Sequence, residues 1–212
     1  REEKDVLILV ATSGDTGKAA LEGFCDVPRT AIQVFYPEGG VSPAQLLQML
    51  TQKGCNVAST AVRGNFDDTQ TGVKRLFTDP AFAAQVEELG YRMSSANSIN
   101  IGRLAPQVAY YFTCYFQLMK QGRVTFGQAV DFVVPTGNFS NILAGYLAKE
   151  MGLPVGRLVC ASNANDVLFD FLNTGVYDRR RRLIRTASPS MDILVSSNLE
   201  RLLYFASGGA WG

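Results

Sequence analysis

The chain alternates short apolar runs with segments of helical spacing, and this alternation limits its fold more than any other feature. VLILVA (6–11) is apolar throughout, which is typical of a strand buried on both faces. Further strand candidates are AIQVFYP (31–37), CNVASTAV (55–62), AVDFVVP (129–135) and RLVCAS (157–162). Strands that alternate with helices predict parallel sheets flanked by helices. We therefore expect an α/β fold in two lobes, residues 1–93 and 94–212.

Local signals predict where several helices begin. Ser42, followed by Pro43, and Asn65, followed by acidic residues, are expected to cap two helices, and Asn165 a third. The strongest helical period runs through residues 108–119. Pro106 predicts that this helix either starts near residue 105 or kinks there.

Composition excludes several classes of function. The chain has no histidine, which excludes Ser-His-Asp catalysis and histidine-ligated metal sites, and we expect no metal. A formal net charge of +1 gives no electrostatic case for nucleic acid, and no segment is long and apolar enough to span a bilayer. The four cysteines form no C-x-x-C pair and are expected to be buried thiols of a reducing, cytoplasmic compartment: Cys25, Cys55, Cys114 and Cys160.

The first polar turn, TSGDTG (12–17), follows the strand VLILVA. Hydroxyls and free N–H groups at a helix start suit a small anion such as a carboxylate, and ligands of doubly wound sheets bind at this end of the strands. The alternative is a simple helix cap made by Asp15 or Thr16. The turn is too short for a nucleotide P-loop, and its Lys18 is followed by alanine.

The second polar turn, PTGNFSN (135–141), also joins a strand to a helix. Its unpaired backbone N–H groups suit a phosphate, although it lacks the G-x-G-x-x-G spacing of dinucleotide-binding folds. A plain helix cap is the alternative.

The third polar turn, SSANSINIGR (94–103), gathers amides, a hydroxyl and one guanidinium. Arg103 could bind a phosphate with two parallel hydrogen bonds, assisted by Asn97 and Ser98. The alternative is a polar loop in which Asn100 caps a helix and Arg103 faces solvent. Two phosphate sites and one carboxylate site suit a phosphorylated cofactor that works on a phosphorylated amino acid.

Taken in order, these motifs resemble threonine synthase of the long bacterial and fungal type, a pyridoxal-phosphate enzyme of the tryptophan-synthase-β-like fold (fold type II). The matching stretches are ATSGDTGKAA (11–20), GNFDDTQTGVK (64–74), SANSINIGRLAPQ (95–107), VPTGNFSNILAGYLAKEMGLP (134–154), ASNANDVLFDFLNTG (161–175) and SPSMDI (188–193). The resemblance implies conversion of O-phospho-L-homoserine and water to L-threonine and phosphate, with pyridoxal 5′-phosphate as electron sink.

The resemblance also assigns roles to individual residues. The cofactor phosphate would lie in the loop formed by Gly137, Asn138, Phe139, Ser140 and Asn141, and Asp15 would contact the cofactor face that carries its hydroxyl. The substrate carboxylate would bind at Thr12, Ser13 and Thr16. The substrate phosphate would bind at Asn97, Ser98 and Arg103.

One departure from the family pattern limits what the chain alone can do. The Schiff-base lysine of the family lies in a Pro-Thr-aromatic-Lys-Asp loop that this sequence lacks, since Lys4-Asp5 adjoins the first strand without that context. We therefore expect a fragment, incomplete at both ends, with the catalytic lysine upstream of Arg1 and no activity of its own. The alternatives are a threonine or serine dehydratase-like enzyme and a non-catalytic phosphate- or nucleotide-binding fragment. Whether the protein is a monomer or a homodimer stays open.

Overall fold

The computed structural model describes residues 4–209, so residues 1–3 and 210–212 of the two predicted lobes lie outside the described part. Its strands are β1 (Asp5–Ala11), β2 (Thr30–Pro37), β3 (Val57–Val62), β4 (Tyr91–Ser95), β5 (Val130–Pro135) and β6 (Val155–Ala161). Its helices are α1 (Asp15–Phe24), α2 (Pro43–Leu50), α3 (Phe66–Thr78), α4 (Pro80–Glu88), α5 (Ile101–Lys120), α6 (Ser140–Glu150), α7 (Val167–Thr174) and α8 (Leu199–Ala206), with a 3-10 turn at Pro189–Met191. The predicted α/β class, with parallel strands flanked by helices, is confirmed.

The chain divides into two compact units. Unit 1 runs to Asn97 and includes Ala187–Ser190, and unit 2 comprises Ser98–Thr186 and the residues from Met191 onward.

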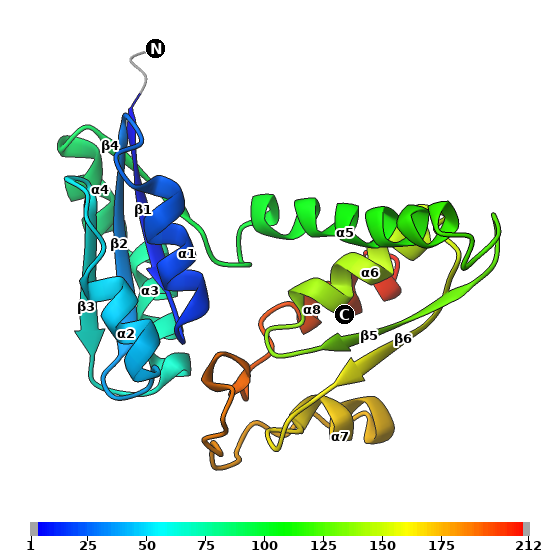
Figure 1. Ribbon diagram of the computed structural model, residues 1–212. Helices are drawn as coiled ribbons and strands as arrows, with labels where there is room; N and C mark the ends of the chain where they lie inside the picture. The colour runs from blue at the N-terminus through cyan, green and yellow to red at the C-terminus, as the bar shows by residue number, and fades with distance from the viewer. Residues whose placement is uncertain (1–3, 210–212) are drawn as a thin grey trace. The chain divides into compact units, whose positions relative to one another are not determined.

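Unit 1 is a four-stranded parallel sheet in the order β3-β2-β1-β4. Along β1, alternate side chains enter different hydrophobic clusters: Ile8 and Val10 pack with residues of α1 and α2, whereas Leu9 and Ala11 pack with residues of α3. The helices therefore cover both faces of the sheet (Figure 1), which explains why VLILVA is apolar throughout.

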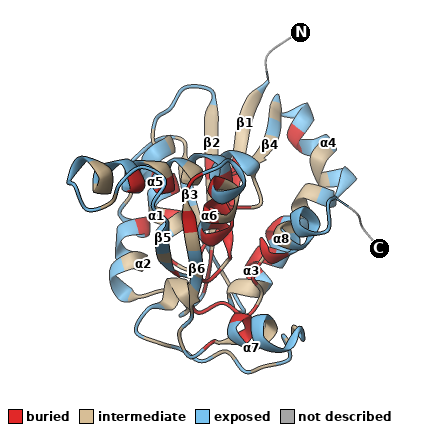
Figure 2. Ribbon diagram, turned by 90° about the vertical axis from the view of Figure 1, so that its right-hand side faces the viewer, coloured by how far each residue is buried: buried red, intermediate tan, exposed pale blue. Residues whose placement is uncertain are grey.

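Unit 2 is built around α6, which connects the two parallel strands β5 and β6. Six residues of α6 are buried, among them Leu143 and Ala148 with no exposed surface (Figure 2). Tyr111 and Tyr115 of α5 pack into the same hydrophobic cluster. The predicted helix over 108–119 is thus confirmed within α5, and of its apolar stripe Tyr111 and Tyr115 are buried whereas Phe116 is exposed.

The structure confirms some predicted caps and corrects others. Ser42 and Asn65 each form a capping box with the residue three positions later. The helix containing Pro106 begins earlier than residue 105, at Ile101, where the Asn100 side chain accepts a hydrogen bond from the Gly102 N–H. The prediction for Asn165 is wrong: α7 begins one residue later than that cap requires, and the Asn165 amide donates to the Ile184 carbonyl and to Asp192 instead.

The expectation that all four thiols are buried is also wrong. Cys55 and Cys114 are exposed, and Cys25 and Cys160 are half-buried.

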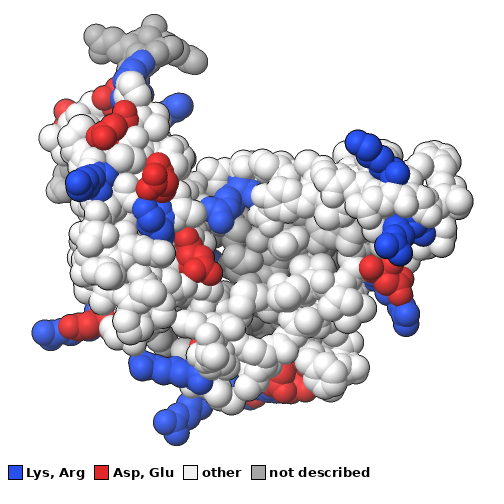
Figure 3. Space-filling model, in the orientation of Figure 1, with Lys and Arg blue, Asp and Glu red and all other residues white. Residues whose placement is uncertain are grey.

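Lys and Arg side chains are interspersed with Asp and Glu on the face seen in Figure 3. Within residues 4–209, no helix is long and apolar enough to cross a membrane, and no group of three or more Cys, Asp or Glu side chains could hold a metal ion.

Candidate functional site

The turn after β1 is organised by Thr12, whose side chain is almost completely buried. Its Oγ1 accepts hydrogen bonds from the N–H of Gly14 at 2.9 Å and of Gly17 at 2.8 Å. Gly14 has a φ of 139°, a backbone conformation that residues other than glycine rarely adopt. The expected alternative, a cap made by Asp15 or Thr16, is therefore not what the structure shows, because Thr12 binds these amides from the strand side.

This turn presents unpaired donors near a carboxylate. In the described part of the chain, the N–H groups of Ser13, Asp15 and Thr16 donate to no protein acceptor. The Asp15 carboxylate accepts a hydrogen bond from Gln45 Nε2 at 2.5 Å. Free N–H groups at the first turn of a helix can bind a small anion.

Asn97 lies in unit 1 just after β4, where its side chain hydrogen-bonds to the last residue of β1. Its Oδ1 accepts from the Ala11 N–H at 2.8 Å, and its Nδ2 donates to the Ala11 carbonyl at 2.6 Å. The side chain is buried. The structure therefore gives Asn97 a role in holding two strand ends together, and its contact with a substrate phosphate stays a prediction.

The loop Gly137–Asn141 opens α6 in unit 2. Phe139 has a φ of 68° and a ψ of 1°, a left-handed conformation that is uncommon for a non-glycine residue, while its side chain is buried. Asn138 Oδ1 accepts from the Ser140 N–H at 3.0 Å and from its hydroxyl at 2.9 Å. Among residues 4–209, no protein acceptor pairs with the N–H groups of Gly137, Asn138, Phe139 and Asn141. The loop thus holds several unsatisfied donors, as a phosphate requires.

The carbonyl groups of the same loop are bound by a segment some sixty residues away. Ser196 Oγ donates to the Gly137 carbonyl at 2.6 Å. Asn198 donates to the Asn138 carbonyl twice, from its backbone N–H at 3.1 Å and from Nδ2 at 2.9 Å. Sequence analysis assigned neither residue to the site, because SSN (196–198) lies far along the chain from the loop that it binds.

Asn141 is held from α5. The Tyr111 hydroxyl donates to the Asn141 carbonyl at 2.8 Å and lies 2.9 Å from its Oδ1. Burial raises the pKa of Tyr111 to about 12, so this hydroxyl keeps its proton at neutral pH and acts as a donor. The first turn of α6 is thereby fixed to α5.

Ser98 and Arg103 also belong to unit 2. Ser98 is buried, and its Oγ accepts from Asn198 Nδ2 at 2.9 Å. Arg201 donates to the carbonyls of Ser98 and Ile99, each at 2.6 Å. The structure therefore brings Ser98 and the Gly137–Asn141 loop together through Asn198, whereas Arg103 is exposed in the first turn of α5.

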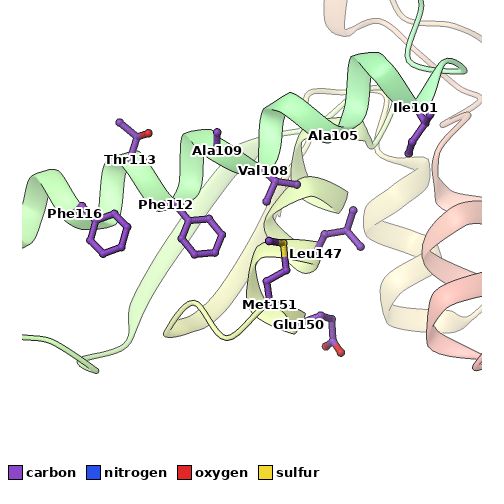
Figure 4. A pocket seen from close by; sticks show the side chains of 10 residues that line it. All are labelled: Ile101, Ala105, Val108, Ala109, Phe112, Thr113, Phe116, Leu147, Glu150 and Met151. Atoms are coloured by element: carbon purple, nitrogen blue, oxygen red, sulfur yellow. The ribbon is translucent and has the colours of Figure 1, made fainter.

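Unit 2 also contains an apolar groove of about 900 Å³ between α5 and α6 (Figure 4). Among its ten lining residues only Thr113 and Glu150 are polar, and none is a predicted site residue. A groove lined in this way does not suit a phosphorylated ligand, because it offers an anion no positive charge.

Similarity to known proteins was found in both sequence and structure, although no family model matches the chain. It is 51% identical over 205 residues to "Threonine synthase-like 1" of Homo sapiens, covering 93% of this chain and 28% of that protein. It is 44% identical to the threonine synthase of Saccharomyces cerevisiae, covering 96% and 38%. The crystal structure of PLP-bound threonine synthase from Brucella melitensis superposes with a TM-score of 0.80 at 46% identity, covering 97% and 42%. The chain spans less than half the length of each of these relatives.

Proposed function

Because this chain is a homologue of threonine synthase over nearly its whole length, we propose that it is part of a pyridoxal-phosphate-dependent enzyme. The protein that contains it would convert O-phospho-L-homoserine and water to L-threonine and phosphate in the cytoplasm. The observation that carries the proposal is the loop Gly137–Asn141. The protein binds the carbonyls of Gly137 and Asn138, while four N–H groups of the loop have no partner among the residues that the structure describes.

The residues of this loop fit the phosphate of pyridoxal 5′-phosphate. A Cβ added at Gly137 would lie 3.0 Å from Ile193 Cδ1, so the loop packs closely against Ile193 at a position where glycine has no side chain. Gly137, Asn138, Phe139 and Asn141 would hold the phosphate through their N–H groups. Ser140 would join them by turning its hydroxyl, which donates to Asn138 Oδ1 in this structure, toward the phosphate. When bound, the cofactor would act as an electron sink for proton removal from the substrate.

The other turns would bind the substrate. In unit 1, the N–H groups of Ser13 and Thr16, which pair with no acceptor within residues 4–209, support a carboxylate contact, with Thr12 fixing the turn from inside. Asp15 would contact the cofactor. In unit 2, the buried Ser98 hydroxyl and the exposed guanidinium of Arg103 would bind the substrate phosphate, to which the sequence also assigns Asn97.

Ligand-dependent stability of the chain tests cofactor binding. We expect pyridoxal 5′-phosphate to raise the melting temperature. Pyridoxal should give little change because it lacks the phosphate that the loop recognises, and ATP because the chain has no P-loop motif. Stabilisation by ATP without any response to pyridoxal 5′-phosphate would instead favour a nucleotide-binding fragment.

Activity is measured on the longest open reading frame that contains this coding sequence. Phosphate release from O-phospho-L-homoserine with formation of L-threonine supports the proposal, whereas deamination of L-threonine or L-serine alone would favour a dehydratase. Loss of a charged hydrogen-bond donor in Arg103→Ala should raise KM about tenfold or more. Arg123→Ala, an exposed arginine beyond α5 in the same unit, is the matched control and should leave KM unchanged.

A further inference from the structure

Asn198 is the polar residue that connects two of the proposed ligand-binding turns. It is 1% exposed. Its Nδ2 donates to both Ser98 Oγ and the Asn138 carbonyl, each at 2.9 Å, and its Oδ1 accepts from Arg201 at 2.6 Å. A buried side chain with its donors and acceptor used in this way holds its partners in a single arrangement.

We propose that Asn198, assisted by Ser196, is a positioning residue that directs the donors of the Gly137–Asn141 loop and of Ser98 toward phosphoryl groups. This inference rests on the proposed function and names the residue that prepares its phosphate sites.

The first argument comes from the geometry of the peptide bond. In a trans peptide the C=O and the following N–H point in opposite directions, and the described backbone contains no cis bond. Ser196 holds the Gly137 carbonyl, which directs the Asn138 N–H away from the 196–198 segment. Asn198 holds the Asn138 carbonyl, which directs the Phe139 N–H the same way. The N–H groups of Asn138 and Phe139 therefore point away from residues 196–198, and no acceptor in the described part of the chain pairs with them.

The second argument concerns the proton of Ser98. A hydroxyl has one hydrogen to donate and two lone pairs that accept. Because Ser98 Oγ accepts from Asn198, and its hydroxyl donates to no acceptor in the described part of the chain, its hydrogen remains for an anion. One amide side chain thus orients a donor in each turn.

The test separates phosphate recognition from general stability. Dissociation constants are measured for pyridoxine 5′-phosphate and for pyridoxine, which differ only in the phosphate and cannot form imines with lysines. The wild-type chain should bind the phosphorylated ligand more tightly. Asn198→Ala should raise the dissociation constant of pyridoxine 5′-phosphate about tenfold and that of pyridoxine less than about twofold, since only donors to the phosphate are misdirected.

The control is Asn173→Ala in the same unit. Like Asn198, Asn173 donates from Nδ2 to a backbone carbonyl, that of Phe169, but it lies on the surface of α7. It should leave both dissociation constants unchanged. Ser196→Ala, which frees the Gly137 carbonyl, should reproduce the phosphate-selective loss and decides the question if Asn198→Ala fails to fold.

Two outcomes would overturn the inference. One is an equal weakening of both ligands by Asn198→Ala, which indicates a purely structural role; the other is wild-type binding of both ligands by Ser196→Ala. A wild-type chain with no preference for the phosphorylated ligand would overturn the proposed function itself, and this is seen before any variant is made.

Discussion

Replacing Gly17 of α1 by alanine has two opposing effects on stability, a gain in helix propensity and a steric cost. Alanine in a helix interior is favoured over glycine by about 1 kcal/mol. However, a Cβ at this position would lie 2.6 Å from Thr12 Cγ2 and 2.9 Å from both Met49 Sδ and Val34 Cγ1. These three neighbours are all buried and cannot turn aside into solvent. Overpacking of this kind costs about 1–3 kcal/mol, so we expect Gly17→Ala to lower the free energy of unfolding by up to about 2 kcal/mol.

Gly23 in the same helix provides the matched control. A Cβ there meets nothing within 4 Å, so Gly23→Ala receives the helix-propensity gain without the steric cost. Urea unfolding followed by far-UV circular dichroism should place the Gly23→Ala midpoint above that of the wild type and the Gly17→Ala midpoint below it. If both variants gain stability equally, the close packing of Gly17 against Thr12 is refuted, and with it the account of how this turn is held.

Three further changes have defined expectations. Thr12→Val leaves the buried N–H groups of Gly14 and Gly17 without their acceptor and should cost about 1–3 kcal/mol more than Thr12→Ser in chemical unfolding. Gly145→Ala would place a Cβ 2.7 Å from the Tyr111 ring and should lower the melting temperature, an expectation that unchanged melting would contradict. Burial raises the pKa of Tyr111 from 10 to about 12, so its contribution to stability is complete below pH 10 and is lost as the pH rises to 12. Relative to Tyr111→Phe, the wild type should lose unfolding free energy over that interval, and parallel curves would refute the assignment.

The sequence predicted the parts of the fold that depend on neighbouring residues. Apolar runs identified β1, β2, β3, β5 and β6. Ser42 and Asn65 identified two helix starts, because a capping box involves residues only three positions apart. The helix α4 was not singled out, although Asp79 followed by Pro80 is a clear start signal and the Asp79 side chain does cap it.

Long-range hydrogen bonds explain what the sequence could not predict. The motif assigns Asn97 to a ligand, which stays a prediction, but it does not indicate that the Asn97 side-chain amide also pairs with the backbone of Ala11, 86 residues earlier. Asn165 is drawn away from its predicted cap by Asp192, whose buried carboxylate also accepts from Asn163 and from the N–H of Thr186. Nothing near these residues in the chain indicates such partners, since the contacts exist only after the chain has folded.

The attachment of the Gly137–Asn141 loop to residues 196–198 has a consequence for protein engineering. PTGNFSN is not a portable module, since a recipient scaffold would receive its glycine and its strained Phe139 without the hydroxyl and amide that orient its peptide planes. A chimera that carries the heptapeptide alone would leave it free to rotate those planes. Transplanting it with SSN, in a geometry that restores both carbonyl contacts, is the minimum graft that keeps the amides aligned.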